Sequence, residues 1–279
     1  MKRLIVNGDD FGRTREVNAG IIRAHREGIL TSASLMVADV ARDEAVALAK
    51  ENPALDVGLH LVVCMGRAVL PPAQIAPLVD TQGNFSNWPV LIGLRYFFSS
   101  SMREKLKAEC RAQIELHLKL IGYLNHIDGH LNFHVHPAIA DIVVELAHEY
   151  KVPCIRIPAE PLFTTMAISR ARSPGKLVES IIFRTLSRRT RRMAEARGIK
   201  SSDRLFGLHQ THHITEDYVV GVIDRLPEGL TEMYFHPALD IGRTPPPPSA
   251  QRETEVLTGA RVREAVSRRG IELTTFGAR

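Results

Sequence analysis

The chain has 279 residues, of which 44% are hydrophobic and 24% are charged, and its formal net charge is +5 at pH 7. These proportions are ordinary for a globular protein and exclude a largely disordered or fibrous chain. No apolar run reaches the roughly 20 residues that a membrane-spanning helix needs, and the N-terminus lacks the pattern of a signal peptide. The 3 cysteines form no CxxC pair, so we expect reduced thiols in a soluble, cytoplasmic protein that can still touch a membrane.

In the first half of the chain, short apolar runs alternate with helical patterns. Strands are expected over residues 4–6, 32–37 and 57–62, and helices over about 14–26 and 42–50. A long irregular stretch follows over residues 67–100, and loops of this length are usually functional or poorly ordered. The capping-box pattern Ser101-x-x-Glu104 then predicts the start of a long helix that Gly122 ends.

The second half continues this alternation but contains a strongly basic segment. Strands are expected over residues 126–130, 154–157, 206–208 and 233–235, and helices over 138–150, 215–226 and about 255–268. Residues 170–197 carry far more arginine and lysine than acid, beside an apolar stripe of Leu177, Ile181, Ile182 and Leu186. The segment is interpreted as an insertion or a lid. Its charge suits a solvated helix face or contact with an anionic membrane.

The regular alternation of strands and helices predicts parallel strands joined by helical crossovers. Most of the strands are continuously apolar, as is typical of strands buried on both faces. We expect a single domain over residues 1–279, an irregular TIM-like (β/α) barrel with about seven parallel strands and a basic helical insertion near 165–204. In such barrels the C-terminal ends of the strands carry the chemistry.

Side chains that can bind a metal occur at four of these strand ends. Asp9 and Asp10 follow the first strand, His60 and His130 belong to later strand ends, and His236 follows the strand at 233–235. Carboxylate and imidazole ligands from several strand ends suit a divalent ion with an open position for water. Such an ion lowers the pKa of its water and polarises a carbonyl, which is the equipment of a hydrolase.

Each of these residues also has an ordinary structural explanation. An Asp-Asp pair is common in turns and helix caps, and a histidine within an apolar strand, such as His60, is often a hydrogen-bonded core residue. His130 and His134 have the spacing of one helix face but lie in a segment that reads as a loop. Asp128 either orients a ligand histidine or forms a turn. It is the combination of the four sites that favours a metal centre.

Five segments of the chain form an ordered set of motifs. They are Asn7-Gly8-Asp9-Asp10-Phe11-Gly12 with Val17-Asn18-x-Gly20-Ile21, Gly58-Leu59-His60-Leu61, Asp128-Gly129-His130 with His134, Arg156-Ile157-Pro158, and Phe235-His236-Pro237. Together they resemble the YdjC-like carbohydrate deacetylases, the family that includes chitooligosaccharide deacetylase, over nearly the whole chain. The version at residues 128–137 is most similar to the branch associated with hopanoid biosynthesis, HpnK. Many family members have a histidine in place of Asn132, so a contact to the sugar is expected to differ here.

The resemblance implies a metal-dependent hydrolase that removes an N-acetyl group from an amino sugar. It implies that Asp10, His60 and His130 bind one divalent ion, with zinc or magnesium expected from the mixed carboxylate and imidazole ligands. No other cofactor is implied.

The resemblance also assigns roles to four residues that do not bind the metal. Asp9 would be the general base that activates water, and His236 the general acid that protonates the leaving amine. His134 and Arg156 would line the substrate pocket.

The resemblance further suggests a glycolipid substrate, N-acetylglucosaminyl bacteriohopanetetrol, met at an anionic membrane surface by a protein that is peripheral at the inner membrane. The alternatives are a deacetylase of soluble chitooligosaccharides and a non-catalytic, metal-binding scaffold at a membrane. No nucleic-acid partner is expected, because no aromatic residues interleave with the basic ones. The sequence leaves a homodimer open.

Overall fold

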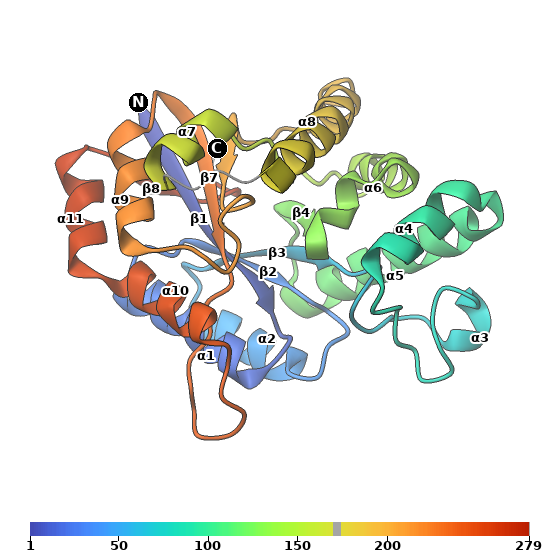
Figure 1. Ribbon diagram of the computed structural model, residues 1–279. Coiled ribbons are helices and arrows are strands. Elements are labelled where there is room, and N and C mark those ends of the chain that lie inside the picture. The colour runs from blue at the N-terminus through green and yellow to red at the C-terminus, as the bar shows by residue number, and fades with distance from the viewer. Residues whose placement is uncertain (170–173, 279) are drawn as a thin grey trace.

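A parallel β-sheet forms the centre of the computed structural model, which describes residues 1–169 and 174–278 (Figure 1). Seven strands lie side by side in the order β5-β4-β3-β2-β1-β7-β6, and β8 also pairs with β1. The strands are β1 (Lys2–Phe11), β2 (Ser32–Leu35), β3 (Asp56–Leu61), β4 (His126–Gly129), β5 (Cys154–Ile155), β6 (Arg204–Phe206), β7 (Gly229–Phe235) and β8 (Glu272–Thr274).

The ends of this row of strands approach each other. A parallel bridge joins Cys154 of β5 to Lys200, which lies shortly before β6. The amide of Ile155 donates a hydrogen bond to the carbonyl of Lys200 at 3.0 Å. The expected irregular TIM-like barrel with about seven parallel strands is therefore confirmed.

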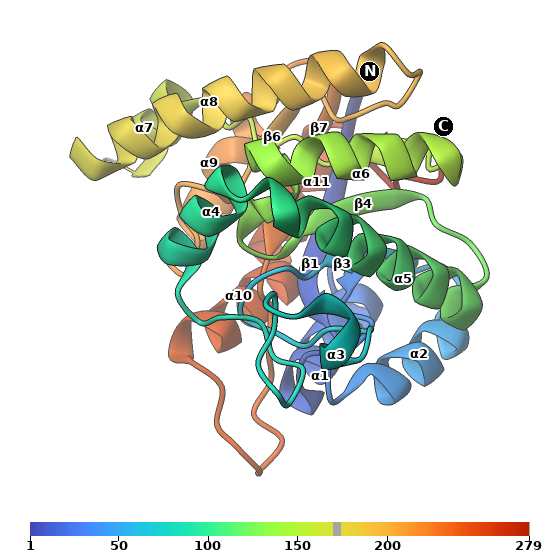
Figure 2. The same ribbon diagram turned by 90° about the vertical axis from the view of Figure 1, so that its right-hand side faces the viewer.

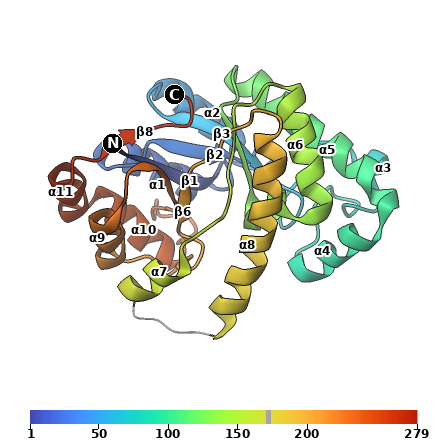
Figure 3. The same cartoon turned by 90° about the horizontal axis from the view of Figure 1, so that it is seen from above.

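Helices cover the outside of the sheet in two groups. Figure 2 shows α5, α6 and α8 stacked on one side, and Figure 3 shows α9, α10 and α11 on the other. The helices are α1 (Arg15–Glu27), α2 (Arg42–Glu51), α3 (Pro72–Ile75), α4 (Pro89–Phe98), α5 (Arg103–Ile121), α6 (Pro137–Glu149), α7 (Leu162–Ser169), α8 (Pro174–Glu195), α9 (Glu216–Arg225), α10 (Pro248–Thr258) and α11 (Ala260–Arg268). Among the described residues, no helix is both long and apolar enough to cross a bilayer.

The predicted capping box does not form. Helix α5 begins at Arg103, and no side chain caps its first turn. Ser101 lies instead in the short 3₁₀ helix Ser100–Met102, and its hydroxyl is 3.0 Å from the hydroxyl of Ser99. A serine that bonds locally in this way is not available to cap the helix.

The observed helices differ from the expected ones in two further segments. The stretch 67–100, expected to be irregular, contains α3 and α4. Helix α4 is apolar on nearly every side, so it shows no clear helical period. The last predicted helix is split into α10 and α11, because Gly259 adopts an extended conformation (φ −64°, ψ 136°).

Two helix glycines offer a matched test of this packing. A Cβ at Gly20 in α1 would lie 2.5 Å from the backbone of Ala238, just beyond β7, whereas a Cβ at Gly93 in α4 would have no neighbour closer than 3.6 Å. We expect Gly20→Ala to destabilise the fold by about 1–3 kcal/mol through overpacking. Gly93→Ala should stabilise it by up to about 1 kcal/mol through helix propensity. Urea unfolding of both variants measures the difference, and equal stabilities would contradict the close approach of α1.

Candidate active site

The C-terminal end of β1 bends so that two adjacent aspartates reach the same cavity. Asp10 has a φ of +67°, and the pairing register with β2 shifts between Gly8 and Phe11. Neighbouring side chains on a regular strand point to opposite faces, so the bend is what lets Asp9 and Asp10 both line the cavity. The cavity has a volume of about 970 Å³.

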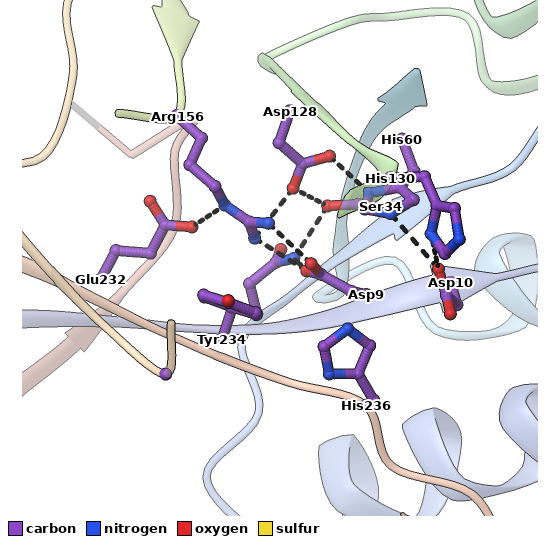
Figure 4. A network of polar contacts seen from close by, with 12 residues as sticks. Asp9, Asp10, Ser34, His60, Asp128, His130, Arg156, Glu232, Tyr234 and His236 are labelled. Atoms are coloured by element: carbon purple, nitrogen blue, oxygen red, sulfur yellow. Dashed lines mark hydrogen bonds and ion pairs between the residues drawn. The ribbon is translucent and has the colours of Figure 1, made fainter. Parts of the chain in front are cut away.

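Three buried side chains from three strand ends meet at Asp10. Its Oδ1 atom lies 3.0 Å from Nδ1 of His130 and 3.3 Å from Nε2 of His60 (Figure 4). His60 comes from β3, and His130 follows β4 directly. The side chains of all three are nearly inaccessible to solvent. The parallel order of the strands thus brings together residues that are 50 and 70 positions apart in the sequence.

These three residues fit a divalent ion. Ligand atoms about 2.1 Å from one ion lie roughly 3–3.5 Å apart, and the two distances to Asp10 have this size. Nε2 of His60, which faces Asp10, is buried and lacks a well-formed hydrogen bond among the described residues. Buried polar atoms normally have partners, so a cation bound between this nitrogen, Asp10 and Nδ1 of His130 would satisfy it. The triad is therefore a candidate divalent-metal site.

Asp128 orients His60 through the ring nitrogen that does not face Asp10. Its Oδ1 atom is 2.8 Å from Nδ1 of His60, which leaves Nε2 of His60 facing Asp10. The hydroxyl of Ser34 donates to the other Asp128 oxygen at 2.7 Å. Carboxylates that hold the second nitrogen of a metal-binding histidine in this way set its tautomer and orientation.

The charged groups of the site shift one another's pKa strongly. Burial alone would raise the pKa of Asp10, but His130 and His60 lower it well below its usual value. Burial would lower the pKa of His60, but Asp128 and Asp10 outweigh it and raise that pKa to about 10. Without an ion, His60 therefore carries a proton at neutral pH, and a metal must displace this proton to bind.

Arg156 lies at the centre of a second, fully buried network. Its guanidinium bonds both oxygens of Asp9 at 2.7 and 2.8 Å, Asp128 at 2.8 Å and Glu232 at 2.5 Å. It also lies 4.7 Å from the centre of the Tyr234 ring. Burial raises the pKa of Glu232 to about 7, although Arg156 opposes this shift. A bidentate ion pair with Arg156 thus fixes the carboxylate of Asp9.

The expectation that Arg156 and His134 line the substrate pocket differs from their observed positions. Both side chains are completely buried, and neither reaches the cavity wall. Nε2 of His134 lies 2.9 Å from the carbonyl oxygen of Arg156. A kink in the short segment His130–Val135 accompanies this separation, because Leu131 and Asn132 adopt left-handed backbone with φ of 53° and 56°. His130 lines the cavity and His134 does not. Asn132, in contrast, does line the cavity.

His236 faces the aspartates from another wall of the cavity. It follows β7 directly, and its backbone amide donates to Oε2 of Glu253 at 2.6 Å. Its ring lies 5.4 Å from that of His212. Sequence reasoning missed Glu232, Glu253 and His212. Glu232 lies within an apolar strand, which is a usable signal, whereas nothing in the local pattern of α10 distinguishes Glu253.

Another possible cluster, formed by Asp9, His60 and Asp128, is a poorer metal site. Arg156 already occupies both carboxylates, and its positive charge repels a cation. The side of His60 that faces Asp10 is therefore the better candidate position for an ion.

The proton on His60 gives a testable pH dependence. Because its pKa is raised to about 10 in the metal-free protein, each unit of pH below that value should weaken metal binding about tenfold. Apparent dissociation constants measured with a competing chelator should fall roughly 100-fold between pH 6.5 and pH 8.5. The stability of the metal-free protein should change in the opposite direction with pH. Protonated His60 stabilises the fold fully below about pH 6.5, and this stabilisation is lost as the pH rises toward 10. Metal binding that does not change with pH would contradict the charged His60.

Comparison with known proteins identifies the family. The family model described as YdjC-like protein matches residues 3–268. A carbohydrate deacetylase of Geobacillus stearothermophilus is 30% identical, with 98% of this chain and 96% of the relative aligned. A carbohydrate deacetylase of Brevibacillus brevis is 45% identical over 157 residues, which cover 56% of this chain and only 59% of that relative.

One solved structure is also similar throughout. It is an Enterococcus faecalis protein, provisionally described as a cellobiose-phosphate cleavage protein. The two share 26% sequence identity with a TM-score of 0.77, and the match covers 99% of this chain and 97% of the other. The chain belongs to the YdjC-like family.

Proposed function

We propose that this protein is a metal-dependent hydrolase that removes the N-acetyl group of an amino sugar. The single observation that carries the proposal is the cavity that Asp9, Asp10, His130 and His236 line together, with His60 buried against Asp10. The names of the Geobacillus and Brevibacillus relatives support the reaction class. A non-catalytic metal-binding scaffold is less well supported, because it would need neither Asp9 nor His236.

In this proposal Asp10, His60 and His130 hold one divalent ion, with zinc or magnesium as the candidates. Such an ion would polarise the acetyl carbonyl and lower the pKa of a water molecule. Asp9 accepts the proton of the attacking water, and Arg156 keeps its carboxylate from rotating out of reach. His236 donates a proton to the leaving nitrogen from its own wall of the cavity. The two proton carriers thus come from different places in the sheet, Asp9 from β1 and His236 from directly after β7.

We propose further that the amino sugar is carried by a lipid. Helix α4 exposes large apolar side chains that soluble proteins normally bury, among them Phe98 at 78%, Phe97 at 56% and Leu94 at 53%. Trp88, just before the helix, is also exposed. A continuous apolar face of this kind is typical of a surface that meets a membrane or another molecule.

Helix α8 supports the same interpretation. Val178, Ile181 and Ile182 are more than half exposed, close to the exposed Arg184 and Arg188. Apolar side chains beside arginines match a surface with anionic headgroups. Leu177, expected in the same stripe, has a side chain outside the part of the chain that the structure describes, as do residues 170–173.

The two helices lie at the same edge of the molecule, and α8 reaches the cavity. Figures 2 and 3 both place α4 and the start of α8 along one side. Phe183 of α8 and Leu131 line the cavity that holds the aspartates. A sugar headgroup could therefore enter the cavity while its lipid stays at the apolar edge. N-acetylglucosaminyl bacteriohopanetetrol, the substrate of the resembled HpnK branch, has this form, and a soluble chitooligosaccharide is the competing substrate.

Replacing the proposed base separates chemistry from metal binding. Asp9→Asn should lower acetate release by about 10²- to 10⁴-fold, because the attacking water loses its proton acceptor. Its metal content should not change, whereas Asp10→Asn should lose metal as well as activity. Acetate release from N-acetylglucosaminyl substrates and elemental analysis measure the two effects. Unchanged acetate release by Asp9→Asn would refute the assigned base.

The lipid-linked substrate is tested with vesicles. The protein should float with phosphatidylcholine vesicles that contain anionic phosphatidylglycerol, and the double variant Leu94→Ser, Phe98→Ser should lose most of this binding. Leu273→Ser, at an exposed apolar position of β8, is the matched control and should bind as well as the unaltered protein.

Turnover distinguishes the two substrates directly. A glycosylated hopanoid in vesicles should be deacetylated faster than soluble N,N′-diacetylchitobiose. Absence of vesicle binding together with faster turnover of the soluble disaccharide would favour the chitooligosaccharide alternative.

A further inference from the structure

A second cluster of metal-binding side chains lies beside the same cavity. One ligand atom from each of His212, His236 and Glu253 lies within 4.8 Å of the others. His212 belongs to the loop between β6 and α9, His236 follows β7, and Glu253 belongs to α10. None of the three is a member of the Asp10 triad, so the two clusters share no ligand.

The chemistry of the second cluster suits zinc. Two imidazoles and one carboxylate are a recurrent zinc-binding set, with a fourth position left for water. Ligand atoms about 2.1 Å from a tetrahedral ion lie roughly 3.4 Å apart, so these atoms need to approach one another by little more than 1 Å. His212 is exposed and can supply this movement by rotating its side chain.

The buried carboxylate of Glu253 is an independent sign of a missing partner. The residue is fully buried, and its Oε2 atom accepts the hydrogen bond from the amide of His236. Its Oε1 atom is also buried and accepts no well-formed hydrogen bond among the described residues, although the backbone amide of His212 lies close to the carboxylate. Leaving a carboxylate oxygen buried and unpaired is costly, and a cation bound between Glu253 and the two histidines would remove that cost.

We propose that His212, His236 and Glu253 form a second zinc site, weaker than the first, whose occupation inhibits the enzyme. The inhibition rests on the proposed function, in which His236 protonates the leaving nitrogen. A nitrogen that donates its lone pair to zinc cannot carry that proton. The site is weaker because its ligand His212 is exposed and has to move closer to the other two, whereas the Asp10 triad is buried and already in contact.

The chain provides a matched pair of variants for the test. His212 and His213 are neighbouring exposed histidines, but only His212 belongs to the cluster. Protein loaded with one equivalent of zinc is titrated with further zinc alone, and binding is followed by calorimetry and by metal analysis after gel filtration. The unaltered protein and His213→Gln should bind a second zinc ion. His212→Gln should bind it at least tenfold more weakly.

Acetate release is then measured over the same zinc range and normalised to the activity of each variant at one equivalent. Inhibition of His212→Gln should require at least tenfold more zinc than inhibition of His213→Gln. Equal second-zinc affinities of the two variants would overturn the site, and tight second binding without inhibition would overturn its effect. The binding measurement needs no substrate, so failure of the proposed deacetylase reaction would be recognised separately as the absence of acetate release at one equivalent.

Discussion

The geometry of this protein depends on one buried guanidinium. Arg156 has no exposed surface and holds Asp9, Asp128 and Glu232 together. These three carboxylates come from β1, β4 and β7, so a single cation connects strands on both sides of the sheet centre. Charges buried at this depth are tolerated only when they are paired, and removing one partner leaves the others uncompensated. The ion-pair network therefore fixes the position of each strand end relative to the others.

The candidate metal site lies next to this network and is positioned by it. Asp128 is shared between Arg156 and His60, so the orientation of a candidate metal ligand is tied to the position of the candidate base. Asp9 faces the guanidinium, while the bend at Asp10 turns the next carboxylate toward the two histidines. Two adjacent aspartates thus acquire different surroundings, one paired with an arginine and the other with imidazoles. Different surroundings are what allow identical residue types to serve different chemistry.

On the outer surface, helix α4 leaves large apolar side chains exposed to solvent. Helix α4 contributes Tyr96 and Ile92 to the core, yet its remaining large side chains are exposed. Such a helix gains less from folding than one with a polar outer face, because its apolar surface stays in water. An apolar surface of this kind is understandable if it is covered when the protein works, which is the role of the proposed lipid interface.

Much of the architecture follows from the sequence alone. Alternating apolar and helical segments indicate a parallel barrel, and the ends of its strands bring together Asp10, His60 and His130, because the C-terminal ends of parallel strands share one edge. The same patterns mislead where local signals compete, as at Ser101, whose hydroxyl bonds a neighbouring serine instead of capping α5. They also fail for α4, whose uniform apolarity hides its period.

Only the tertiary structure decides which polar groups meet in the interior. The two partners of Arg156 that determine its position, Asp9 and Glu232, are 147 and 76 residues away in the chain. No local pattern encodes such pairings, because they depend on which strands become neighbours and on how deeply the charges are buried. For the same reason the sequence marks Arg156 as important but not as a buried support, and it gives no hint that Glu253 lies beside His236.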